Sequence, residues 1–462
     1  VYALCLGGLG FLNTWDFPIY LFLIMLVMGV RLAWEHGGLS WAVAGRAVAG
    51  AVALGLLGAL LYLPFYAGFQ SQAGGILPNF LFGTRLSQFF VMFGPLLVAV
   101  VFLLIALSTR GGISLRGFLG FFAASILLPV AFLTMVLVVG LLTPGGQELV
   151  SRLRDLPMVQ QSGAANFGQL AIEVAKIRLG SPWTYLFLAA LLAWVLALLA
   201  KRLSTPADLP PTDLPPATLP PVTFALLALL TALLLVFSVE FVYLRDTFGT
   251  RMNTVFKFYF QAWVLMAVVA AFAVVYLAKY AGRALRWVSL PVIALVVIAG
   301  LFYPAFGTIT RAERFRSTPT LDGTAYLTPQ NGGDAAAIAW LRQNVPGVAT
   351  ILEASGGSYS YAGRISAQTG LPTLLGWDGH ELQWRGNTIE QDKRRPDIER
   401  IYRYATGSEL RQLLDRWQID YVIVGDLERQ TFGVTPQSEA RLAQVMDLVY
   451  DAEGVRIYRR RG

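Results

Sequence analysis

The segment Glu240-Phe-Val-Tyr-Leu-Arg-Asp-Thr-Phe-Gly-Thr-Arg-Met-Asn-Thr-Val-Phe-Lys257 decides the fold, because it places five ionisable residues between two long apolar runs. The runs cover residues 222–241 and 255–278, and each is long enough to cross a hydrocarbon core of about 30 Å. A charge at the centre of a membrane helix costs about 3 kcal/mol on insertion scales. Charges kept at such a boundary therefore either pair with one another or serve an ion, a proton or a charged substrate.

The rest of the chain has the composition of a multispanning membrane protein. Hydrophobic residues make up 56% of the chain and charged residues 14%. Six further apolar runs predict spans, at residues 18–34, 47–66, 89–107, 118–142, 183–200 and 287–306. Residues 1–12 resemble the end of another helix, so we expect earlier helices to precede Val1. We therefore expect an α-helical polytopic membrane domain over residues 1–306, truncated at its N-terminus.

The distribution of Lys and Arg predicts the orientation. If the loop after the first complete span is cytoplasmic, alternate loops hold nine basic residues: Arg31, Arg46, Arg110, Arg116, Lys201, Arg202, Lys279, Arg283 and Arg286. The short loops on the other side hold Arg85 and the three basic residues of the opening segment. Because cytoplasmic loops carry an excess of basic residues, we expect a multi-pass protein of the cell membrane. Its tail after residue 306 is then extracytoplasmic.

Two connections have a pattern of their own. The repeated Pro-Pro pairs within residues 201–221 favour an extended polyproline II spacer. In residues 143–182, Leu149, Leu153, Leu156 and Val159 recur at helical spacing beside charged residues. This pattern predicts an amphipathic helix on the membrane surface, either covering a substrate groove or simply packing there.

The tail predicts a separate extracytoplasmic α/β domain over residues 334–462, joined by a connecting segment at 307–333. The tail from residue 307 onward holds 19 basic and 19 acidic residues, so the whole net charge of +8 belongs to the membrane part. This charge indicates contact with anionic lipid headgroups and an anionic substrate rather than with nucleic acid. Helices are predicted at 334–344, 408–417 and 438–447, and strands at 348–353, 421–424 and 455–459, the last as an edge strand. Alternating helices and strands favour a sheet with helices packed against it.

The densest polar cluster of the tail is Gly376-Trp-Asp-Gly-His-Glu-Leu-Gln-Trp-Arg385. Aromatic faces beside carboxylates and amides suit a pyranose, which offers an apolar face and a rim of hydroxyls. The candidate sugar-binding or acceptor-binding residues are Trp377, Asp378, His380, Glu381, Gln383, Trp384 and Arg385. The alternative is a structural loop with tryptophan packed into the core. Metal binding through His380 with Asp378 or Glu381 also stays open.

A second motif, Asn13-Thr-Trp-Asp-Phe-Pro18, enters the first complete span from the predicted external side. Asp16 is therefore expected on the same face of the membrane as Glu240, Asp246, Arg251 and Lys257. A purely structural interpretation makes this motif a helix start, with Thr14 or Asp16 as N-cap and Pro18 in the first turn. The two roles are compatible.

Three motifs carry a resemblance to a known family. NTWDFPIY at 13–20, the segment Glu240–Trp263 and GWDGHELQWR at 376–385 resemble those of the YYY membrane protein family, which is similar to the GT-C integral membrane glycosyltransferases. That similarity implies an external catalytic face, a C-terminal extracytoplasmic domain and a polyprenyl-phosphate-linked sugar as donor. It also implies characteristic acidic residues in a first external loop, upstream of Val1.

The resemblance implies roles for the charged residues present. The acidic candidates for catalysis are Asp16, Asp246 and Glu240, and a divalent metal ion held by Asp16, Asp246 or upstream acids is plausible without an assigned site. The candidates for binding the donor phosphate are Arg251, Lys257, Arg245 and Asn253. The expected reaction moves the sugar from the lipid phosphate to a glycan or protein acceptor on the outer face, with membrane lipid as the surrounding partner.

Other interpretations of the same residues remain open. The charges of the opening segment can instead form internal ion pairs that fix helix ends, such as Arg245 with Asp246 or Glu240 with Arg251. A transporter or lipid flippase would use them as a substrate pathway, although no convincing inverted repeat is present. A noncatalytic membrane protein that binds envelope glycans would need only the external domain.

Overall fold

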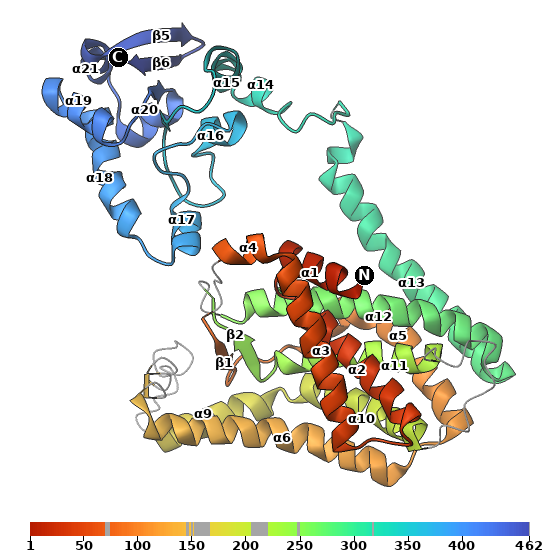
Figure 1. Ribbon diagram of the computed structural model, residues 1–462. Helices are drawn as coiled ribbons and strands as arrows, with labels where there is room; N and C mark the ends of the chain where they lie inside the picture. Colours follow the sequence, from red (N-terminus) through yellow and green to blue (C-terminus); the bar gives the residue numbers. More distant parts are fainter. Residues whose placement is uncertain are drawn as a thin grey trace. The chain divides into compact units, whose positions relative to one another are not determined.

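The chain divides into two compact units, Val1–Thr308 and Ile309–Gly462, and the boundary falls within helix α13 (Figure 1). The computed structural model describes residues 1–69, 74–144, 147, 148, 151, 167–204, 220–246, 250–316 and 318–461. The predicted amphipathic helix around Leu149–Val159 and the proline-rich part of the predicted spacer, at 205–219, lie outside these residues.

The first unit is a bundle of long apolar helices. Its described helices are α1 (Tyr2–Leu12), α2 (Asp16–Glu35), α3 (Trp41–Leu61), α4 (Leu63–Gly68), α5 (Leu86–Gly111), α6 (Leu115–Leu142), α9 (Phe167–Gly180), α10 (Trp183–Ser204), α11 (Pro221–Ser238), α12 (Met252–Tyr280) and α13 (Arg283–Arg311). Among the described residues, eight helices are long and apolar enough to cross a membrane: α2, α3, α5, α6, α10, α11, α12 and α13. The predicted class, a polytopic membrane protein, is therefore confirmed.

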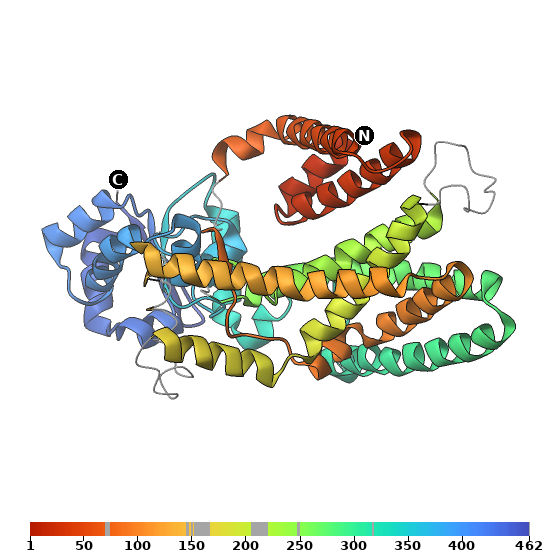
Figure 2. The same ribbon diagram turned by 90° about the horizontal axis from the view of Figure 1, so that it is seen from below.

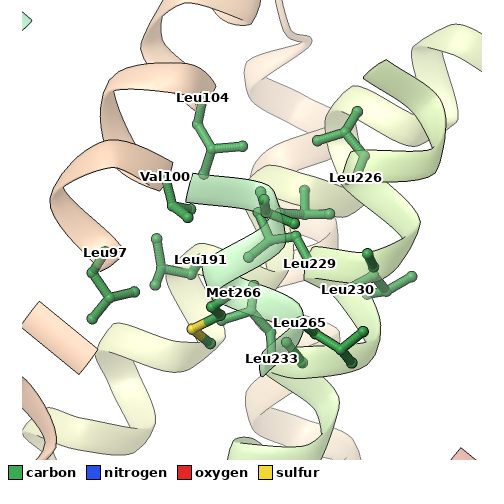
Figure 3. Close-up of a cluster of buried hydrophobic side chains, with 14 of the residues drawn as sticks. Leu97, Val100, Leu104, Leu191, Leu226, Leu229, Leu230, Leu233, Leu265 and Met266 are labelled. Atoms are coloured by element: carbon green, nitrogen blue, oxygen red, sulfur yellow. The ribbon is translucent and has the colours of Figure 1, made fainter. Parts of the chain in front are cut away.

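The core of the bundle lies among α5, α10, α11 and α12. Figure 3 shows leucines of all four helices pointing toward one another around Met266 of α12. Helix α11 is apolar all round, and 72% of its spanning window is buried, so it occupies the centre. Helices α6 and α13 are 0% and 6% buried and run along the outside of the bundle (Figure 2), where their apolar side chains face the lipid.

Helix α11 ends at Ser238, three residues before the end of the predicted span. The chain then turns into strand β2 (Val242–Leu244), which pairs antiparallel with β1 (Ile76–Pro78), with Leu77 opposite Tyr243. Two strands that lie so far apart in the sequence carry little signal of their own, because each is only three residues long. Part of the segment Glu240–Lys257 is thus a short strand, β2, which follows the end of α11.

The start of α2 differs from the predicted cap. The N-cap residue is Trp15, and no side chain caps the helix; Asp16 is already in the first turn. The Asp16 carboxylate instead accepts a hydrogen bond from the Asn13 side-chain amide at 3.0 Å. Neither Thr14 nor Asp16 is therefore the N-cap of α2.

The second unit is a three-layer α/β structure. Its elements are η2 (Glu313–Phe315), α14 (Leu327–Gln330), α15 (Gly332–Asn344), β3 (Ile351–Leu352), α16 (Arg364–Thr369), α17 (Asp378–Arg385), α18 (Ile389–Arg403), α19 (Gly407–Arg416), β4 (Tyr421–Val424), α20 (Asp426–Phe432), α21 (Pro436–Val445), β5 (Met446–Ala452) and β6 (Val455–Arg460). The strand order is β3-β4-β6-β5, with β3 and β4 parallel and the other pairs antiparallel. Val422 and Val424 face α18, α19 and α21, whereas Ile423 faces α15, as the two-residue period of a strand requires.

One prediction for this unit is wrong, and the end of one predicted helix differs by two residues. The segment at 455–459 was expected to be an edge strand, but β6 lies between β4 and β5. The predicted helix at 438–447 ends at Val445, and Met446 and Asp447 begin β5, which then pairs with β6 across the Glu453-Gly454 turn. An additional strand next to β6 moves it to the interior of the sheet.

A buried ion cluster lies where the parallel strands β3 and β4 end. The Arg364 guanidinium donates to Asp334 at 2.7 and 2.9 Å and to Glu428 at 2.9 and 3.0 Å, and it lies 3.6 Å from Glu353. Glu353 accepts two backbone N–H groups from the start of α16 at 2.7 and 2.8 Å. One cation therefore joins α15, α16, α20 and the end of β3.

Replacing Arg364 by Met should destabilise the second unit by about 3–5 kcal/mol, because the carboxylates of Asp334 and Glu428 would stay buried without their cation. Limited proteolysis of the full-length protein measures this as faster cleavage between residues 318 and 461. The matched control is Arg411→Met, which removes an exposed guanidinium of the same unit and should leave the cleavage rate unchanged. Equal cleavage of the two variants would contradict the structural role of the cluster.

The same cluster predicts a pH dependence of stability. Burial raises the pKa of Glu353 to about 7 from an ordinary value of 4.5, although the two N–H groups and Arg364 oppose the rise. The native state then binds a proton that the unfolded state does not. This contribution is fully present below the unfolded pKa and is lost as the pH rises through about 7. The proteolysis assay repeated across this range should show faster cleavage at the alkaline end, and Glu353→Gln should flatten the profile.

Candidate functional site

The ends of α5, α9, α10, α11 and α12 meet around Glu240 at one end of the bundle. Glu240 follows the end of α11, and its side chain is almost completely buried, at 2% residue exposure. Arg251, at the start of α12, donates to Glu240 Oε1 at 3.0 Å and to the Val239 carbonyl at 3.0 Å. Thr84, before α5, donates its hydroxyl to the same oxygen at 2.6 Å. We call Asn79, Thr84, Arg178, Glu240 and Arg251 the anchoring cluster.

Thr84 connects Glu240 to the neighbouring helices, because all of its polar atoms form hydrogen bonds. Its backbone N–H donates to Glu240 at 3.1 Å, and its carbonyl accepts from Thr184 of α10 at 2.5 Å. Since its hydroxyl proton goes to Glu240, the hydroxyl oxygen accepts from Arg251 at 3.1 Å and from the Tyr259 hydroxyl at 3.1 Å. Helices α5, α10 and α12 are thereby fixed to the end of α11.

Asn79 and Arg178 satisfy the backbone carbonyls that the end of α11 exposes. The Asn79 amide donates to the carbonyls of Phe82, Val239 and Glu240 at 2.7–3.3 Å. Arg178, in the last turn of α9, donates to the carbonyls of Phe80 and Glu240 at 2.8 and 2.5 Å and also to that of Asn79. Unsatisfied carbonyls at this depth would each cost several kcal/mol, so both side chains have a structural role.

The structure therefore contains the Glu240–Arg251 ion pair, as expected if the charges of this segment fix the helix ends. The Arg251 side chain is only 14% exposed and its donors point at Glu240, Val239 and Thr84. A guanidinium held in this way stabilises the fold. The candidate groups for ligand chemistry are consequently those on the neighbouring face of α12.

That face forms a second polar cluster with the start of α2, which we call the rim cluster: Asp16, Tyr20, Lys257 and Gln261. Asp16 and Tyr20 lie one turn apart on α2, and Lys257 and Gln261 lie one turn apart on α12. The Tyr20 hydroxyl donates to Gln261 at 2.8 Å, and the Asp16 carboxylate interacts with Gln261 and, electrostatically, with Lys257. Asp16, Tyr20 and Lys257 are partly accessible, whereas Gln261 is buried beneath them.

Lys257 stands over an aromatic surface. Its ammonium lies 4.3 Å from the centroid of the Trp15 ring, within the range of a cation–π interaction. Trp15 in turn packs edge-on against Phe258, with the ring centroids 6.3 Å apart. The charge is therefore oriented by an aromatic ring and remains half-buried, without a direct ion pair among the described residues.

An apolar groove of about 410 Å³ begins at this aromatic pair. Its lining comes from the start of α2, from α11, from β2 and from α12, and includes Thr14, Trp15, Pro18, Ile19, Phe22, Leu234, Leu235, Leu244 and Phe258. A volume of this size is within the range of small-molecule sites. The rim cluster lies beside the Trp15 end of the groove. The groove therefore has polar side chains beside one end and apolar walls along the rest.

The remaining candidates of the opening segment lie close to the start of α12. Asn253 donates its amide to Asp246 at 2.8 Å, and Asp246 is within electrostatic reach of Lys257. Arg245 is exposed; within the part of the chain that is described, its side chain makes no hydrogen bond or ion pair. Asp246, Asn253 and Lys257 thus lie on the accessible side of the segment, whereas Glu240 and Arg251 lie on its buried side.

In the second unit, the predicted sugar-binding residues form helix α17 rather than a loop. Trp377 precedes the helix and donates its indole N–H to the Ala362 carbonyl at 2.6 Å. The Asp378 carboxylate accepts from Arg395 at 2.7 Å, and Arg385 donates to Glu381 at 2.7 Å. Trp377, His380, Glu381, Trp384 and Arg385 line a hollow of about 500 Å³. Asp378 lies at the base of the helix, and Gln383 does not line the hollow.

Several residues of these sites carry no signal of their own in the sequence. Asn79 and Thr84 belong to the connection before α5 and Arg178 to the last turn of α9, and only the tertiary contacts bring them to Glu240. Tyr359 packs against Trp377 and His380, with ring centroids 5.6 and 5.4 Å apart, and its Gly-Gly-Ser-Tyr-Ser surroundings are the one local hint. In the described ranges, no group of three or more His, Cys, Asp or Glu residues is arranged to hold a metal ion.

Glu240→Gln and Arg251→Gln should each destabilise the membrane unit by about 3–5 kcal/mol, since either change leaves the partner charge buried and unpaired. The double variant should lose less than the sum of the two, because no lone charge remains. Thermal unfolding in detergent measures the three variants. Arg31→Gln and Glu35→Gln, which break an exposed pair on α2, serve as controls. Strictly additive losses would contradict a direct pairing.

Comparison with known protein families finds a match over most of the membrane unit. No curated protein matches the chain. A family model described as "uncharacterized membrane protein (DUF2298)" matches residues 1–266, which is more than half of the chain and includes both the anchoring cluster and the rim cluster. The chain therefore belongs to the DUF2298 family of uncharacterized membrane proteins, the family commonly called YYY.

Proposed function

We propose that this protein is a glycosyltransferase that moves a sugar from a polyprenyl-phosphate donor to an acceptor at the membrane surface. One observation carries the proposal: the half-buried Lys257 ammonium and the Asp16 carboxylate adjoin an apolar groove between membrane helices. A substrate with a charged head and a long hydrocarbon tail matches such a combination. The likeness of the YYY motifs to GT-C glycosyltransferases supports the same assignment.

The groove suits the hydrocarbon part of the donor. Its walls are aromatic and aliphatic, and they belong to helices that cross the membrane, so an isoprenoid chain can leave it directly into the lipid. Trp15 and Phe258 lie at the polar end. A soluble substrate would instead favour a groove lined by many hydrogen-bonding groups.

The phosphate belongs beside Lys257. A lysine ammonium is a compact point charge that binds phosphate well. The N-terminal ends of α2 and α12 lie at the same end of the bundle, and their partial positive charges also favour an anion. Asn253 and Arg245, close to the start of α12, extend the polar surface.

In the proposed reaction, an acceptor oxygen forms a bond to the anomeric carbon of the sugar while the bond from that carbon to the phosphate oxygen breaks. Asp16 accepts the proton of the acceptor hydroxyl, and Lys257 stabilises the charge on the departing lipid phosphate. Asp246 and Asn253 orient the groups around Lys257. The anchoring cluster takes no part in the chemistry; it holds the start of α12 in place.

The charge distribution supports a location for the site. The basic residues of the short loops concentrate on the side opposite to the rim cluster, as expected if the rim cluster faces outward from a cell membrane. The second unit, beyond α13, then lies on the outer side as well. A glycan or protein at the cell surface is the corresponding acceptor.

Lys257→Ala should lower the turnover of a labelled polyprenyl-phosphate sugar by at least about 100-fold, because the leaving phosphate loses its counter-charge. Lys257→Arg should retain part of the activity. The assay follows release of lipid phosphate from proteoliposomes that contain the full-length protein. Lys279→Ala, at the opposite end of the same helix, is the matched control and should be fully active.

Asp16→Asn should abolish transfer while donor binding persists, since the base is lost and the groove is intact. If no donor is turned over, but labelled lipid crosses the bilayer in a Lys257-dependent way, the protein is a flippase and the transferase proposal is wrong. Unchanged turnover in Lys257→Ala would equally overturn the assigned phosphate site.

A further inference from the structure

We propose that the second unit carries a glycan-binding site, formed by Tyr359, Trp377, His380, Glu381, Trp384 and Arg385, which we call the aromatic dish. Five of these residues line a single hollow of about 500 Å³, and Tyr359 stands beside it against Trp377 and His380. The site lies wholly within residues 318–461 and does not rest on the proposed transfer reaction.

Two aromatic rings of the dish are exposed although they belong to a well-packed unit. Trp384 is 67% exposed and Tyr359 is 82% exposed. Tyr359 also adopts a left-handed backbone conformation, with φ at 62°, which is rare for a bulky residue. A strained backbone at an exposed ring motivates a functional role for Tyr359.

The Trp377 side of the dish is held in place by hydrogen bonds within the second unit. The Trp377 indole is held by its hydrogen bond to Ala362, and the Asp378 N–H donates to the Gly356 carbonyl at 3.2 Å. Helix α17 packs closely against the Tyr359 segment at Gly379, where a Cβ would lie 2.3 Å from Ser358 Oγ. Pre-organised rings lose little conformational entropy on binding.

The chemistry of the dish matches a pyranose. A sugar ring with equatorial hydroxyls offers flat C–H faces that stack on tryptophan and tyrosine, and its hydroxyls need both donors and acceptors at the rim. Glu381 supplies acceptors, Arg385 supplies donors, and His380 supplies either. The Glu381–Arg385 pair at 2.7 Å also keeps these groups oriented toward the same rim.

A lipid surface is the competing occupant, since tryptophan and tyrosine also favour the membrane interface. Surfaces that bind anionic lipids carry an excess of Lys and Arg. Here each arginine is balanced: Arg385 pairs with Glu381, and the adjacent Arg395 pairs with Asp378. A hollow without excess positive charge favours a neutral, hydroxyl-rich ligand, so we assign the dish to a neutral oligosaccharide of pyranoses with equatorial hydroxyls.

The test is calorimetric titration of cellohexaose and of chitohexaose into the full-length protein in lipid nanodiscs, which avoid the sugar headgroups of common detergents. Saturable binding of either oligosaccharide is expected. Trp384→Ala and Tyr359→Ala should each weaken it by about 5-fold or more, and Trp384→Phe should retain most of it. The control is Tyr404→Ala, which removes a tyrosine of similar exposure (62%) outside the dish and should bind normally.

Hydroxyl-radical footprinting, read peptide by peptide, locates the ligand independently. The oligosaccharide should protect the peptides that contain Trp384 and Tyr359. Absence of binding by both oligosaccharides, or binding that survives in the Trp384→Ala/Tyr359→Ala double variant, overturns the proposal. Protection of Trp384 by nanodisc lipid alone would assign the dish to the membrane surface and would overturn it too.

Discussion

The membrane unit depends on one buried ion pair, between Glu240 at the end of α11 and Arg251 at the start of α12. Two charges at this depth are stable only when every donor and acceptor is satisfied, and Thr84 completes the set through its hydroxyl, N–H and carbonyl. Helices α5, α10, α11 and α12, which share the leucine core, also meet at this point (Figure 3). The polar end and the apolar core thus fix the same four helices.

This arrangement divides the charges of one short segment into two groups. Glu240 and Arg251 are buried and neutralise each other, whereas Asp246 and Asn253 are partly accessible and Lys257 lies over Trp15 at the start of α2. Lys257 sits six residues after Arg251, so the helical period turns it away from Thr84 and toward Trp15. A rigid structural pair and an accessible cation can therefore coexist within two turns of one helix.

The second unit separates structure and recognition in a similar way. Arg364 is enclosed by Asp334, Glu353 and Glu428 at the end of the parallel strands, and it holds together the helices around that edge. The aromatic dish is built outside this cluster, where Trp377 and Gly379 join α17 to the Tyr359 segment. Buried ions specify the packing, and exposed rings remain available to a ligand.

The sequence by itself determined the spans, the position of β4 and the existence of a separate α/β unit, because apolar length and periodicity act locally. It also singled out Glu240–Lys257 and Trp377–Arg385 as unusual. Only the tertiary structure decided which charges pair, since Thr84, Arg178 and Glu240 are far apart in the chain and the cost of burial depends on their contact. The same holds for β1, β2 and β6, whose neighbours are set by long-range pairing, and for Tyr359, whose role follows from the ring it touches.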